Sequence, residues 1–140
     1  MLVLPAPIVE QIRDHLRLAY PNEGAGLLLG AEQAGKREIS QVLTLANAFA
    51  DEEQYHRFLL TAEDMLAGEL AAAEAGLDVL GIFHSHPDCP NVPSEYDREY
   101  ALPWYSYLIV RVDNGESVSY RSWLLNDDRL AYTEEPVQIL

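Results

Sequence analysis

The spacing of apolar residues predicts a helix close to the start of the chain. Within residues 7–20, Ile8, Ile12 and Leu16 recur at the four-residue spacing of a helix that buries one face. Pro7 suits the first turn, where its missing N–H costs no hydrogen bond. We therefore expect an amphipathic helix over this stretch.

Short strands follow this helix. The apolar segment 23–30 is punctuated by glycines and is typical of a buried strand, and the alternating segment 39–45 indicates a second one. Residues 57–60 are predicted to form a third strand. Residues 77–86 are predicted to form another buried strand, which leaves the sheet at Pro87.

Two further helices are indicated by their caps. Thr61 can cap a helix that runs through an alanine-rich stretch and stops at Gly76. Ser94 can cap a short helix over residues 95–101, with acidic residues in its first turn. Each of these helices lies between two predicted strands, so helices and strands alternate along this part of the chain.

The C-terminal part is predicted to be mostly strand. Residues 105–112 and 118–125 pair across a turn at residues 113–115, and residues 137–140 add an edge strand. The chain of 140 residues contains no internal repeat or linker. We therefore expect a mixed α/β (α+β) fold and a single domain over residues 1–140.

Composition places the chain among globular proteins. Apolar residues make up 49% and charged residues 23%, which allows a hydrophobic core without disulfides. Nine basic residues stand against 23 acidic ones, for a formal net charge of −14 at pH 7. Such a surface repels nucleic-acid phosphates and anionic membranes, so we expect neither as a partner.

We expect a cytoplasmic protein. The single cysteine, Cys89, cannot form an internal disulfide, which favours a reducing compartment. The apolar residues 1–4 are too few for the core of a signal peptide. The most apolar later stretch, residues 101–110, has about half the length of a membrane-spanning helix.

The most specific local feature is His84-Ser85-His86 at the end of a predicted buried strand. In an extended chain, residues i and i+2 project to the same face, so both imidazoles can meet at one point. Asp97 follows eleven residues after His86 and shares a helical face with Ser94. Two histidines and one carboxylate form a zinc ligand set that leaves a fourth position for water, although Fe²⁺ and Mn²⁺ also accept such ligands.

A catalytic metal site needs a base for the water, and Glu23 is the best candidate. It begins the glycine-rich segment 23–30, where small residues allow the backbone to approach closely. A carboxylate there is placed to take a proton from the water. Taken singly, Ser94 is explained as a helix cap, Asp97 as a first-turn charge and Glu23 as a solvated turn residue. Their joint spacing favours a site.

Cys89 has two interpretations. It lies three residues after His86, and a thiolate is a good zinc ligand. A fourth protein ligand would close the site and hinder turnover unless it served as a removable brake. The alternative is an ordinary loop cysteine.

These residues resemble a known family. The run from His84 to Asp97 matches the pattern H-x-H-P-x(6)-S-x-x-D of JAMM (MPN-plus, or Mov34/MPN/PAD) metalloproteases. Glu23 lies in an E-x-x-G-x-L-x-G context that is also similar to that family, as are Asn47 and Arg57-Phe58 in the intervening segment. The compact size resembles the stand-alone prokaryotic branch.

The resemblance implies a fold and a set of roles. The fold is cytidine-deaminase-like, with a mixed central sheet flanked by helices and the metal site at a strand end and the following short helix. His84, His86 and Asp97 would hold one Zn²⁺ per chain. Glu23 would take the proton of the water and pass it to the leaving amine, and the Ser94 hydroxyl would donate to the oxyanion.

It also implies a substrate class: an amide bond after the C-terminal Gly-Gly of a ubiquitin-like protein or of a sulfur carrier of the ThiS/MoaD type. Two alternatives stay open, namely a non-catalytic interaction module of the same fold and a zinc amidohydrolase that acts on a small molecule. Specificity would come from this one domain or from a second copy of it in a homodimer.

Overall fold

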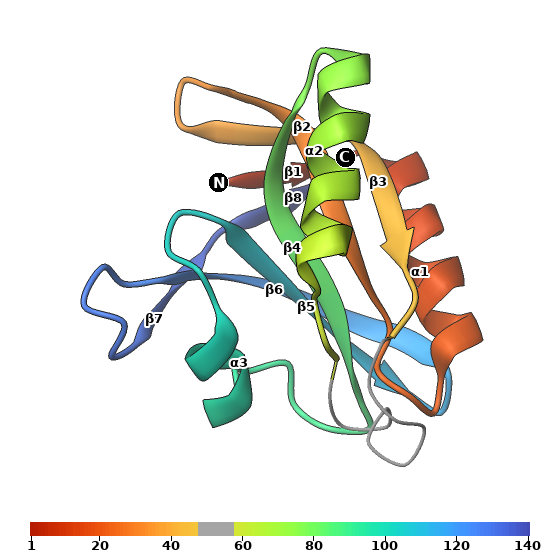
Figure 1. Cartoon of the computed structure of the whole chain (residues 1–140). Helices are drawn as coiled ribbons and strands as arrows, with labels where there is room; N and C mark the ends of the chain where they lie inside the picture. Colours follow the sequence, from red (N-terminus) through yellow and green to blue (C-terminus); the bar gives the residue numbers. More distant parts are fainter. Residues whose placement is uncertain (48–57) are drawn as a thin grey trace.

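The computed structural model describes residues 1–47 and 58–140, in which helices flank both faces of a mixed β-sheet (Figure 1). The elements in chain order are β1 (Leu2–Leu4), α1 (Ala6–Ala19), β2 (Ala25–Gln33), β3 (Lys36–Leu45), α2 (Ala62–Ala75), β4 (Asp78–Pro87), α3 (Glu95–Tyr100), β5 (Ser106–Asp113), β6 (Glu116–Leu125), β7 (Tyr132–Glu135) and β8 (Val137–Ile139). The expected mixed α/β architecture is confirmed.

The eight strands form one sheet in the order β7-β6-β5-β4-β2-β3-β1-β8. β4 runs parallel to β5, and β1 runs parallel to both β3 and β8, whereas the other neighbours are antiparallel. The two outermost strands, β7 and β8, are consecutive in sequence and only Pro136 separates them. The sheet therefore curves until its two edges approach each other at this residue.

One face of the sheet is covered by α1. The helix buries Ile8, Ile12 and Leu16, as their spacing predicts. They pack with Leu28 of β2 and Phe83 of β4 in a core that also draws on β1, β3 and β5. This core fixes β2 against β4, the pair of strands that leads into the candidate site.

The opposite face is covered by α2. Thr61 and Asp64 form a capping box at its start, and Gly76 ends it with a positive φ of 69°, as predicted. Gly68 costs the helix about 1 kcal/mol relative to alanine, but a Cβ there would collide with the side chain of Leu27. The glycine lets α2 lie directly on β2.

Several sequence predictions differ from the structure. The strand predicted for residues 57–60 is wrong over the described residues 58–60, which are irregular; Arg57 lies outside the described residues. Phe58 and Leu60 are apolar because they pack against the core beneath α2. The predicted hairpin turn is confirmed, with positive φ at Asn114 and Gly115.

Two strands, β1 and β7, were not predicted, and β2 and β3 extend further than expected. The predicted edge strand near the C-terminus is confirmed as β8. Among the described residues, no helix has both the length and the apolar character needed to cross a membrane.

Candidate metal centre

The end of β4 presents two histidines to the same side of the sheet. His84 and His86 are 7% and 6% exposed, and their ring centroids lie 5.1 Å apart. Because strand side chains alternate, Ser85 between them points to the face that α1 covers. The pattern read from the sequence therefore holds in three dimensions.

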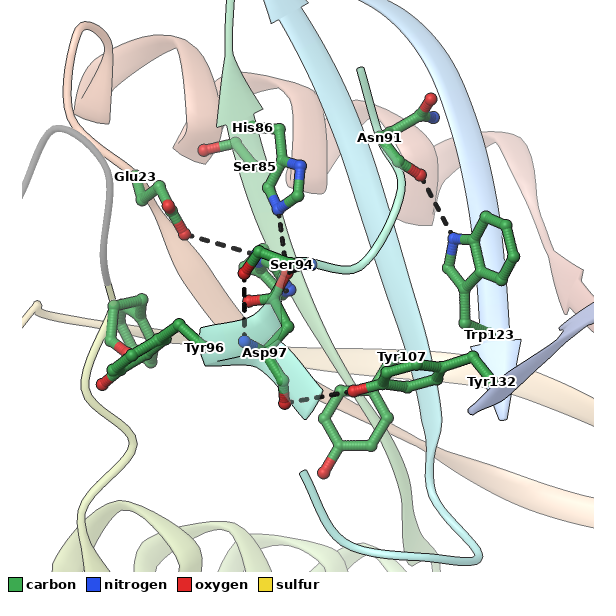
Figure 2. Close-up of polar contacts among 12 residues, drawn as sticks. Glu23, Ser85, His86, Asn91, Ser94, Tyr96, Asp97, Tyr107, Trp123 and Tyr132 are labelled. Carbon is green, nitrogen blue, oxygen red and sulfur yellow. Dashed lines mark hydrogen bonds and ion pairs between the residues drawn. The ribbon is translucent and has the colours of Figure 1, made fainter. Parts of the chain in front are cut away.

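Asp97 comes from the first turn of α3, and its carboxylate contacts His86 (Figure 2). Its Oδ2 lies 3.1 Å from His86 Nε2, and its Oδ1 lies 3.7 Å from His84 Nε2. The position is fixed by a capping box, in which Ser94 Oγ accepts from the Asp97 N–H and Asp97 Oδ2 accepts from the Ser94 N–H. Helix capping thus orients the carboxylate toward β4.

The three side chains fit a metal ion. One donor atom from each of His84, His86 and Asp97 lies within 4.8 Å of the others. Tetrahedral zinc with bonds of about 2.0–2.1 Å separates its ligand atoms by about 3.3 Å, which the two distances to Asp97 bracket. His86 Nδ1 donates to the Pro90 carbonyl at 2.8 Å, so Nε2 is the ring nitrogen free to bind a metal.

Charge is concentrated at this cluster. Burial lowers the pKa of His84, but the Asp97 and Glu23 carboxylates outweigh it and raise the pKa to about 9. Burial likewise raises the pKa of Asp97, but His84, His86 and the Ser94 N–H hold it well below its ordinary value. The carboxylate is therefore ionised at neutral pH, as a metal ligand must be.

Glu23 is buried beside the histidines, in the irregular segment between α1 and β2. Its Oε1 lies 3.4 Å from His84 Nδ1, which is an ion-pair distance. The contact does not meet hydrogen-bond geometry, so this buried ring nitrogen has no hydrogen-bond partner among the described residues. The carboxylate faces the cluster without being one of its three grouped ligands (Figure 2).

Two hydrogen bonds, one of them to a side chain, hold the Glu23 segment against β4. Ser85 Oγ accepts from the Gly24 N–H at 2.9 Å, and the Ser85 N–H donates to the Gly24 carbonyl at 3.0 Å. Gly24 has no Cβ, and one there would lie 2.8 Å from the Cβ of Ala19. The glycine therefore lets this segment pass close to α1 and bring Glu23 to the histidines.

The hydroxyl of Ser94 can accept one hydrogen bond and donate another at the same time. Its oxygen accepts a hydrogen bond at 3.0 Å from the Asp97 N–H, which confirms the predicted cap. A hydroxyl has two lone pairs and one hydrogen, so capping leaves its hydrogen available for a second partner.

Further residues that the sequence did not single out hold the loop and helix of the site (Figure 2). Trp123 Nε1 donates to the Asn91 carbonyl at 3.2 Å, and the Asn91 side chain donates to the Ile109 carbonyl. Tyr132 Oη donates to the Asp97 carbonyl at 3.1 Å. Burial raises the pKa of Tyr132 well above its ordinary value, so its hydroxyl remains a donor.

Two other sequence candidates lie near the site. Cys89 is exposed and is not one of the three grouped donors in the described part of the chain. Burial first, and then Glu23, raise the pKa of its thiol. Asn47 donates from its side chain to the Glu23 carbonyl at 3.4 Å.

Known proteins are similar to this chain in sequence and fold. Residues 5–126 match the model of the Prok-JAB family, described as prokaryotic homologs of the JAB domain. The "Probable TtuB-protein conjugate cleaving protease" of Thermus thermophilus is 36% identical over 120 residues, which cover 81% of this chain and 72% of that protein. The "CysO-cysteine peptidase" of Mycobacterium tuberculosis is 28% identical over a region that covers 100% of this chain and 92% of that protein.

A solved structure has a similar fold. A protein from Desulfitobacterium hafniense superimposes with a TM-score of 0.87 at 30% identity, covering 100% of this chain and 93% of the other. The fold, the family match over most of the chain and the resemblance in its motifs lead to one conclusion. The chain belongs to the prokaryotic JAB family.

Proposed function

We propose that this chain is a zinc-dependent peptidase that hydrolyses the amide bond after the C-terminal Gly-Gly of a ubiquitin-like or sulfur-carrier protein. The observation that carries the proposal is the convergence of His84, His86 and Asp97 on one point, with the buried carboxylate of Glu23 facing it. Related proteins with peptidase and protease names support the reaction class.

The donor set suits zinc. Two imidazole nitrogens and one carboxylate oxygen leave a fourth tetrahedral position open, the arrangement of catalytic rather than structural zinc sites. When bound there, zinc would polarise the scissile carbonyl and lower the pKa of water to about 7. The chain's own part is to orient two of the ligands: the Pro90 carbonyl fixes the tautomer of His86, and the Ser94 N–H positions the Asp97 carboxylate.

Glu23 is proposed as the general base. Its carboxylate accepts the proton of the attacking water and then donates it to the leaving amine, so the proton is conserved over the reaction. The Gly24–Ser85 hydrogen bonds keep the carboxylate in place while it exchanges this proton. Ser94 donates its free hydroxyl hydrogen to the oxygen of the scissile carbonyl as negative charge develops there.

A diglycine tail suits such a site physically. Glycine lacks a side chain, so an extended Gly-Gly segment can pass close to the strand end and the loop that carry the ligands. The relatives' names mention cleavage of a protein conjugate and a peptidase that acts on a protein–cysteine pair, both compatible with a protein tail as substrate.

Cleavage of a defined substrate tests the proposal. The purified chain is incubated with a sulfur-carrier protein extended beyond its Gly-Gly, and with a dipeptide amide, before and after removal of metal by a chelator. We expect cleavage after Gly-Gly that stops on chelation and returns with zinc. Faster hydrolysis of the dipeptide amide would indicate a small-molecule amidohydrolase, and carrier binding without any cleavage would indicate an interaction module.

A further inference from the structure

Helix α3 carries Asp97 and is capped by Ser94, but it has no apolar face that fixes its place on the sheet. The structure describes all six of its residues, and none of them is buried. Helices in globular proteins are ordinarily held by an apolar face that packs on the core. The capping box orients Asp97 within α3, but it does not orient α3 relative to the histidines of β4. Other contacts must therefore hold this helix at the site.

Two arginines join α3 to the turn between β6 and β7. Arg98 of α3 donates from Nη1 to the Arg129 carbonyl of this turn at 3.0 Å. In return, Arg129 donates from Nη2 to the Glu99 carbonyl of α3 at 3.2 Å. These two bonds form a reciprocal arginine clasp. A third bond comes from β7, where Tyr132 Oη donates to the Asp97 carbonyl at 3.1 Å (Figure 2).

The turn is held by hydrogen bonds of its own. The Asn126 N–H donates to the Ala131 carbonyl at 2.9 Å, and the Arg129 N–H donates to the Asn126 carbonyl at 2.8 Å. Thr133 Oγ1 donates to Asn126 Oδ1 at 2.8 Å. Arg129 has a positive φ of 63°, which a residue with a Cβ disfavours, so these bonds also hold its backbone in place. The turn therefore presents Arg129 to α3 from a fixed support.

We propose that Arg129 is a positioning residue of the candidate metal site. Its side chain contacts the backbone of α3, so its effect on the site passes through the helix. By holding α3, it sets how far Asp97 and Ser94 lie from the two histidines of β4. Arg98 is the other half of the same clasp. The inference rests on the proposed function, because zinc is the ion that Asp97 would help to bind.

The charge of Arg129 makes the direction of the expected effect informative. A cation near a metal site repels the metal ion, so removal of the guanidinium should, by its charge alone, leave zinc affinity unchanged or raise it. Loss of the clasp acts in the opposite direction, because a group that orients a metal ligand contributes to metal affinity. A lower zinc affinity in Arg129→Ala therefore cannot be assigned to the lost charge.

Competition with a zinc chelator tests the proposal. We expect Arg129→Ala to bind zinc about 10-fold more weakly than the unaltered chain. Arg17→Ala is the matched control, because it removes the same charge from an exposed arginine of α1 that pairs with Glu116. Its zinc affinity should stay within about twofold of the unaltered chain. An undiminished affinity in Arg129→Ala would overturn the inference alone, whereas absence of zinc binding by the unaltered chain would refute the proposed function as well.

Hydrogen exchange distinguishes a loosened helix from a loosened fold, and it does not depend on zinc. Without added metal, the amide protons of α3 in Arg129→Ala should exchange at least about fivefold faster, while those of α1 and β4 keep their rates. The Arg98 N–H, which donates to the Ser94 carbonyl at 3.0 Å, is a suitable probe. Unchanged exchange in α3, or equal acceleration throughout the chain, would contradict a positioning role for Arg129.

Discussion

The Ser85 hydroxyl accepts a hydrogen bond from the Gly24 N–H at 2.9 Å, although 61 positions separate the two residues in sequence. The contact joins the segment that carries Glu23 to the strand that carries both histidines. The two histidines and the proposed base are therefore held together by this contact. The distance between Glu23 and the histidines depends on the hydrogen bond between Gly24 and Ser85.

Replacing Ser85 with alanine tests this support. We expect Ser85→Ala to retain zinc, because the histidines stay on β4, and to lower kcat by about 10-fold as Glu23 loses its fixed position. The control is Ser122→Ala, which removes a buried hydroxyl that donates to Glu135 on another part of the sheet. Each change costs about 1 kcal/mol of stability, so equal losses of activity in both would assign the effect to stability alone.

Asp97 is expected to couple metal binding to the structure of α3. Asp97→Ala removes a proposed ligand and one half of the capping box, so zinc content and activity should be lost together. Glu95→Ala is the matched control, because Glu95 lies in the same helical turn, is exposed and pairs with Arg98. Metal analysis of both purified variants checks this. Stoichiometric zinc in Asp97→Ala would remove Asp97 from the ligand set.

Trp123 is predicted to act on the metal from a distance. Its indole N–H holds the Asn91 carbonyl, and the preceding Pro90 carbonyl orients His86. Trp123→Phe keeps the ring but not the donor, and we expect zinc affinity to fall about 10-fold, at the low end for residues that orient a ligand. Competition with a zinc chelator measures the zinc affinity of the variant. Trp104→Phe, at a half-exposed tryptophan outside this loop, should leave the affinity unchanged.

The metal-free protein should lose stability as the solution becomes alkaline. The pKa of His84 is raised to about 9 in the folded chain, above its unfolded value of about 6.5. A raised folded pKa gives stability that is fully present below pH 6.5 and is lost as the pH rises through 9. Urea unfolding of chelator-treated protein between these values should show a falling midpoint. His84→Gln should flatten the curve, and an equal slope in that variant would assign the effect to other groups.

Much of the site was predictable because its signals are local. The spacing of two residues between His84 and His86 fixes their common face within one strand, and Ser94 and Asp97 form a capping box within one helical turn. Glu23 was proposed as the base from its place at the start of a glycine-rich segment, and the resemblance to a known family pointed to the same residue. All these expectations about position agree with the structure, while the chemical roles stay predictions.

What the sequence could not predict depends on contacts between distant segments. The spacing of the two histidines does not predict the role of Ser85, because its partner Gly24 lies in a distant segment of the chain. Trp123 and Tyr132 reach the site only because β6 pairs with β5 and β7 pairs with β6. β1 and β7 are three and four residues long, too short for a periodic pattern to be recognised. Phe58–Leu60 was misread as strand because apolar residues that line a cleft look the same in sequence.

The most direct test of the account is Glu23→Gln. The amide keeps the size of the side chain and leaves His84, His86 and Asp97 in place, but it cannot accept the proton of water. We predict stoichiometric zinc together with a fall in kcat of about 10²–10⁴-fold on a Gly-Gly-extended carrier protein. Normal turnover by the zinc-loaded variant would contradict the account, because the carboxylate that faces the metal site would then not be its base.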